Sequence, residues 1–100
     1  MDVTPIPKPE KRLIDKDYTA FVASFPCMRC HKPSGPPHHV RRFHWGGASR
    51  KPDDIYQIPL CPDCHDDIHN KPKEFDDVDI LLCILALWRM RFVESNDTVN

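Results

Sequence analysis

Apolar residues recur at helical spacing near both ends of the chain, and the first of these stretches predicts a short helix over residues 16–24. Asp15 is placed to cap its first turn, and Pro26 ends it. The apolar side of this helix is formed by Tyr18, Phe21, Val22 and Phe25.

The second stretch predicts a last helix over residues 76–93. Acids lie at its N-terminal end and bases near its C-terminal end, which is the order that the helix dipole favours. These charged residues are Asp76, Asp77, Asp79, Arg89 and Arg91. Its apolar run, residues 80–88, is far shorter than the roughly 20 residues that span a bilayer, so no membrane association is expected. This helix is expected in the core or at an interface, where it could form the face of a homodimer.

Between these helices the pattern predicts two short strands, over residues 38–43 and 55–60, joined by a Gly- and Pro-containing loop over 44–54. A further helix is predicted from Pro62 to about Asn70, where Asn70 and Pro72 stop it. The fold class is therefore α+β. We expect a flexible arm over residues 1–12 and a single domain over 13–95.

Two Cys-x-x-Cys pairs flank the predicted strands. A two-residue spacer lets both sulfurs of a pair reach one ion, and four thiolates satisfy one tetrahedral zinc. The sequence therefore predicts a structural Zn²⁺ that ties the start of the domain to the last helix of the strand–strand–helix unit. Its ligands would be Cys27, Cys30, Cys61 and Cys64.

Four histidines suit a second, open metal site. His65 and His69 are four residues apart and share one face of the predicted helix. His38 and His39 are adjacent on a predicted strand, where successive side chains point to opposite faces. One of the two can therefore join the metal ligands, and the other is left to act as a general base.

Composition and charge narrow the function. At 100 residues the chain has a small core that a structural metal would stabilise. Its start, MDVTPIPKPEKR, has no apolar stretch, so no signal peptide is expected and a cytoplasmic protein is predicted. The net charge is −1, but residues 27–52 hold six Lys or Arg and no acid, whereas residues 53–79 hold nine acids and two lysines. The basic segment is a candidate for contact with nucleic-acid phosphates, although a solvated basic loop would look the same.

Residues 25–70 resemble the HNH endonucleases, whose domain is the ββα-metal (His-Me finger) fold. The motifs that carry the resemblance are FPCMRC, PPHHV and IPLCPDCHDDIH. With YTAFVAS before the first pair and WGGASRKPDD in the loop, the chain is also similar to small phage and prophage members of that superfamily, some of them linked to recombination.

The resemblance implies roles for individual residues. His39 would be the general base, and His38, His65 and His69 would hold a catalytic divalent metal, which could be Mg²⁺, Mn²⁺, Ni²⁺ or Zn²⁺. The middle Asn of the family falls on Tyr56, so Tyr56 or Asp54 is expected to brace the loop that orients the base. The candidate DNA contacts are Arg41, Arg42, His44, Arg50 and Lys51, with Trp45 beside them.

Two functions follow from these patterns. The first is a metal-dependent endonuclease that nicks or cuts DNA with little sequence preference. The second is a non-catalytic zinc-binding module that binds DNA or a protein partner. The first needs the four histidines to converge, whereas the second needs only the cysteines.

Overall fold

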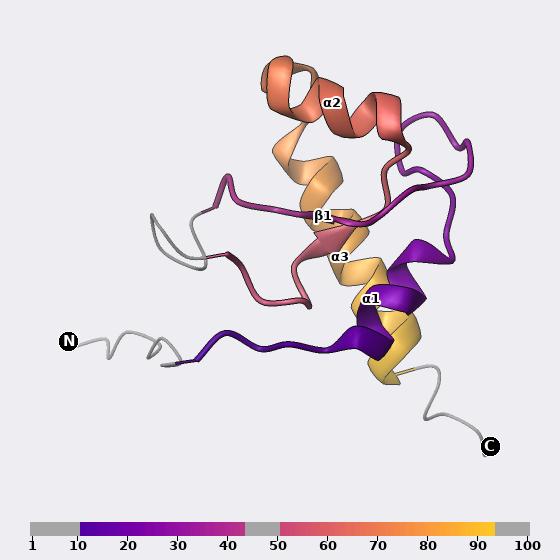
Figure 1. The fold of residues 1–100 in the computed structure, drawn as a ribbon, viewed down its shortest axis with the longest axis vertical. Coiled ribbons are helices and arrows are strands. Elements are labelled where there is room, and N and C mark those ends of the chain that lie inside the picture. Colours follow the sequence, from indigo (N-terminus) through magenta and orange to yellow (C-terminus); the bar gives the residue numbers. More distant parts are fainter. Residues whose placement is uncertain (1–10, 44–50, 94–100) are drawn as a thin grey trace, which may run out of the picture.

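The computed structural model describes residues 11–43 and 51–93, which form a small α+β unit of three helices and a two-stranded sheet. Helix α1 (Lys16–Ala23) leads through the first cysteine loop to strand β1 (His38–His39). Strand β2 (Gln57–Ile58) returns antiparallel to β1 and leads into helix α2 (Pro62–Asn70). After a 3₁₀ turn, η1 (Pro72–Glu74), helix α3 (Asp77–Trp88) runs behind the hairpin and α1 (Figure 1) and ends in a π-helical turn, η2 (Arg89–Val93).

The helix boundaries follow from local chemistry. The Asp15 carboxylate accepts the backbone N–H of Tyr18 at 3.0 Å, so the predicted cap and the predicted helix are confirmed. Helix α2 starts at Pro62 as predicted. Asp76 caps α3 by accepting the N–H groups of Val78 and Asp79, and the predicted helix continues to Val93 through the wider π turn.

The strands are shorter than predicted. His38 pairs with Ile58 and His39 with Gln57, and the ladder goes no further among the residues that are described. The N–H of Tyr56 donates to the carbonyl of Asp53 instead of to β1, and Pro59 has no N–H to donate. Strand β2 is therefore only two residues long.

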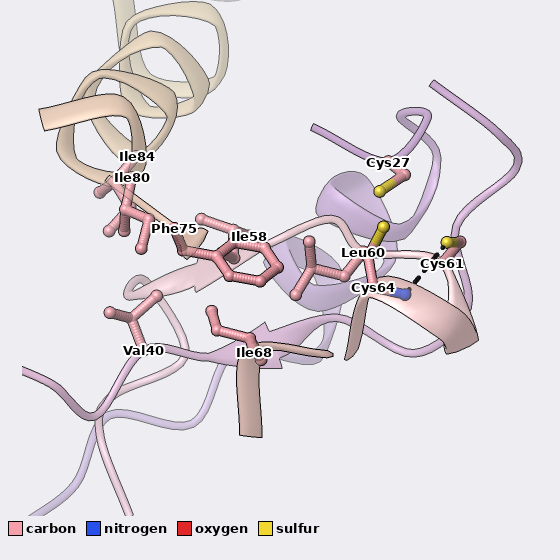
Figure 2. Packing of buried hydrophobic residues seen from close by; sticks show 10 residues of the cluster. All are labelled: Cys27, Val40, Ile58, Leu60, Cys61, Cys64, Ile68, Phe75, Ile80 and Ile84. Atoms are coloured by element: carbon pink, nitrogen blue, oxygen red, sulfur yellow. Dashed lines mark hydrogen bonds between the residues drawn. The ribbon is translucent and has the colours of Figure 1, made fainter. Parts of the chain in front are cut away.

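The core lies between the hairpin, α2 and α3. Figure 2 shows Ile80 and Ile84 of α3 on one side of Ile58, Leu60 and Phe75, with the cysteines at the other end of the same cluster. A smaller cluster of Tyr18, Val22 and Leu87 joins α1 to α3. The structural metal predicted at the cysteines would therefore be continuous with the hydrophobic core.

Helix α3 is also the longest apolar helix in the described part of the chain, and neither it nor any other helix there has the length and hydropathy needed to cross a membrane. Of the arm expected over residues 1–12, residues 1–10 lie outside the described residues. Arg12, the last residue of that arm, contacts Pro52 and Asp54.

A candidate metal centre beside a histidine–aspartate pair

The four cysteines of the two pairs come together as the sequence predicts. Their sulfur atoms all lie within 4.8 Å of one another, a spacing that one metal ion could bridge. The first pair lies in a tight loop in which the N–H of Cys27 donates to the carbonyl of Lys32 and that of Met28 to Pro59. His31 takes a positive φ of 66° to close this loop, and the second pair belongs to the first turn of α2.

The electrostatics of this cluster favour a bound cation. Burial, together with hydrogen bonds that the Cys64 thiol donates to the neighbouring sulfurs, raises the pKa of Cys64 to about 12. Burial also opposes ionisation of Cys27, but backbone N–H groups of Cys30, Cys61 and Arg29 outweigh it and lower the pKa of Cys27 to about 6. Thiolates this close repel one another unless a cation shares their charge, and soft sulfur ligands select zinc-like metals.

Three histidines form a second cluster. His38 on β1 faces His65 and His69 on α2, with ring centroids 5.0 and 5.2 Å away, and one nitrogen of each ring lies within 4.8 Å of the others. The two helical histidines are one turn apart, with ring centroids 5.2 Å from each other. The predicted alternation on β1 is confirmed, because His38 alone of the adjacent pair points at α2.

Two of these imidazoles, His38 and His65, are kept in the neutral state, which is the state that binds a metal. Burial, together with the nearby His65 and His69, lowers the pKa of His38 to about 3. Burial also lowers the pKa of His65. Three imidazole donors leave positions open on a divalent ion, as in catalytic rather than structural sites.

His39 points to the other side of the strand, where it contacts Asp54. Its Nε2 lies 2.9 Å from the Asp54 Oδ1. A carboxylate can only accept, so Nε2 carries the proton and donates it to Asp54, leaving the lone pair on Nδ1. Burial lowers the pKa of His39, and the hydrogen bond to Asp54 partly opposes that effect. His39 is thus a neutral imidazole, and its hydrogen bond to the Asp54 carboxylate determines which ring nitrogen carries the proton.

Arg12 completes this arrangement and was not anticipated from the sequence. Its Nη2 donates to the same Asp54 Oδ1 at 2.6 Å, and its Nε donates to the carbonyl of Pro52 at 2.9 Å. The other carboxylate oxygen of Asp54 accepts the backbone N–H of Asp15 at 2.7 Å. Burial would raise the pKa of Asp54, but these partners and His39 outweigh it and hold the pKa of this carboxyl below its usual range.

A second residue that the sequence did not single out is Gln57. It is fully buried, and its amide Nε2 donates to the carbonyl of Asp54 at 2.7 Å and to the hydroxyl of Thr19 at 2.8 Å. Gln57 thereby fixes the backbone that carries Asp54 against α1. Tyr56, the residue at the position of the family's middle Asn, packs against Trp88 with ring centroids 5.8 Å apart. Of the two residues expected to brace the loop, Asp54 contacts His39.

The residues predicted to contact DNA differ in their surroundings. Arg41 and Lys51 are exposed, and Arg41 borders a hollow of about 130 Å³ that His38 and His69 also line. Arg42 instead donates to the carbonyls of Pro72 and Phe75 and to the Asp77 carboxylate, so it ties the end of β1 to η1 and α3. The other candidates, His44, Trp45 and Arg50, lie outside the described residues.

Comparison with known proteins gives a family. The family model described as "Protein of unknown function (DUF968)" matches residues 4–79, a range that contains both clusters, Arg12 and Asp54. The chain is 33% identical over 72 residues to the uncharacterized protein YdfU of Escherichia coli (strain K12). That similarity covers 72% of this chain and 20% of YdfU, so the chain spans about a fifth of the length of this relative. No solved structure matches the chain.

Proposed function

The chain belongs to the DUF968 family, and we propose that it is a metal-dependent endonuclease of the HNH type that hydrolyses DNA phosphodiester bonds. The observation that carries this proposal is the division of an adjacent histidine pair. His38 joins His65 and His69 in a cluster with metal-ligand spacing, while His39 is turned away and hydrogen-bonded to Asp54. A zinc-binding module without catalysis has no need of either arrangement.

In this proposal β1, β2 and α2 form a ββα-metal unit. The four cysteines hold a structural zinc at the start of α2. His38, His65 and His69 hold a divalent cation, for which three imidazoles are a suitable donor set. When bound, that cation would stabilise negative charge on the scissile phosphate and on the leaving oxygen.

The protein's own residues then supply base and substrate contacts. His39 accepts a proton from the attacking water at Nδ1, because Nε2 already donates to Asp54. Asp54 holds the ring and stabilises the imidazolium that forms, and Arg12 and Gln57 hold Asp54 in turn. The exposed Arg41 and Lys51 contact phosphates of the duplex, which positions it without reading its sequence.

A plasmid-nicking assay tests the proposal. Protein treated with EDTA should not nick supercoiled DNA, and adding back Mg²⁺, Mn²⁺ or Ni²⁺ should restore nicking while the more tightly held zinc stays in place. His65→Ala should need a higher metal concentration or fail to nick. Wild-type protein that keeps one zinc and cleaves DNA with none of these metals would contradict the nuclease and favour the binding module.

The role of Asp54 can be tested separately from the metal. Asp54→Asn should lower the rate of nicking about 10- to 100-fold, because an amide can present its N–H₂ to His39 and release the tautomer that leaves Nδ1 as the base. The metal content should not change, since Asp54 is not a ligand. Asp53→Asn is the matched control, because Asp53 accepts the N–H of Leu13 rather than contacting His39. Equal rates for the two variants would remove Asp54 from the mechanism.

A further inference from the structure

Helix α3 has two apolar faces, and within residues 11–43 and 51–93 only one of them is covered. Ile80, Ile84 and Leu87 are buried against the hairpin and α1. Val78, Leu82 and Leu85 remain 59%, 58% and 54% exposed. Leu82 lies two residues from both Ile80 and Ile84, which is about 200° around a helix, so this second face points away from the core.

The exposed face has the spacing of a helix-pairing surface. Val78, Leu82, Leu85 and the exposed Arg89 follow one another at intervals of four, three and four residues, which keeps them on one stripe of the helix. The apolar surface continues beside this stripe into a hollow of about 220 Å³ between α3 and the first cysteine loop, lined among others by Met28, Ala86 and Met90. An apolar stripe of this kind on a small domain marks an interaction site.

The charged residues at the two ends of the stripe indicate what kind of partner would bind there. Asp79 is exposed beside its N-terminal end and Arg89 is exposed at its C-terminal end. A second α3 laid antiparallel across the stripe brings Asp79 of each copy toward Arg89 of the other and leaves leucines to meet in the middle. The surface is therefore complementary to itself, which is what a two-fold interface requires. A parallel arrangement would instead place like charges together.

We propose that this face binds a second copy of the chain, with the two α3 helices antiparallel and Leu82 of each copy against Leu85 of the other. The histidine cluster and His39 belong to the hairpin and α2, whereas Leu82 and Leu85 lie on the exposed face of α3, away from the residues that pack on the hairpin. The proposed interface therefore uses none of the histidines. This proposal can be tested without the proposed nuclease activity, because sedimentation measures only the mass of the protein in solution.

Sedimentation equilibrium on the full chain tests the dimer. Wild-type protein at about 0.1 mM should show twice the 11.7 kDa chain mass, and Leu82→Asp should show the mass of one chain while keeping its helical circular dichroism. Ile14→Asp is the matched control, because Ile14 is 64% exposed but precedes α1. A monomeric wild type, or equal dissociation of the Leu82 and Ile14 variants, would overturn the proposal.

Charge reversal tests the antiparallel arrangement. Asp79→Arg and Arg89→Asp should each weaken self-association tenfold or more, because each places like charges together twice in the dimer. An equimolar mixture of the two variants should associate as the wild type does, since the mixed pair regains both opposite-charge contacts. Single variants that associate like the wild type, or a mixture that stays as weak as each variant alone, would refute this pairing.

Discussion

Replacing His39 by alanine should lower the rate of DNA nicking by a factor of about 10² to 10⁴, which is the contribution of a general base. The variant should keep both metals, because His39 faces Asp54 and the three proposed metal ligands lie on the other side of β1. Nicking rates should be measured at saturating metal, with the metal content of each preparation counted by mass spectrometry.

His38→Ala is the informative comparison, since it changes the same residue type one position away. It should lose affinity for the catalytic metal, so that part of its activity returns at higher metal concentration. His39→Ala should not respond to added metal, but small imidazoles added to the buffer should restore some nicking. If His39→Ala nicks DNA at the wild-type rate, His39 is not the base and the proposed mechanism is wrong.

The parts of this site that were predicted from the sequence are those encoded by short spacings. A four-residue interval placed His65 and His69 on one face of α2, and adjacency on a strand separated His38 from His39. The Cys-x-x-Cys pairs were expected to converge, and they do. In each case the ligand geometry depends on backbone periodicity, which is fixed once the element type is known.

The parts that were missed depend on contacts between distant segments. Arg12 reaches Asp54 across some 40 residues of sequence, and no local pattern marks it as anything but part of a basic arm. Gln57 was read as one more strand residue, yet its buried amide fixes the backbone of Asp54. For Arg42, predicted as a DNA contact, the sequence did not indicate the hydrogen bonds that its guanidinium donates to two carbonyls and Asp77. Such roles depend on which acceptors the fold brings close, and composition carries no information about that.

Replacing Cys27 by serine should unfold the domain rather than merely inactivate it. Structural zinc sites contribute about 10–16 kcal/mol of apparent binding free energy in small metal-dependent folds, and a serine hydroxyl cannot replace a thiolate ligand. Cys27 is fully buried and packs in the same cluster as Leu60, Ile68 and Phe75, so loss of the metal would also loosen the core. We expect less than one zinc per chain and loss of the cooperative thermal transition, measured by mass spectrometry and circular dichroism.

Cys83→Ser is the matched control for this effect. Cys83 is half-buried on α3 and lies outside the cysteine cluster, and burial alone raises the pKa of its thiol to about 11. Its replacement should therefore change packing slightly and leave zinc content at the wild-type value. A Cys27→Ser protein that melts at the same temperature as Cys83→Ser and retains its zinc would show that the four cysteines do not hold a structural metal. The support for the hairpin and for α2, and with it the alignment of His38 with His65 and His69, would then have to come from the hydrophobic core alone.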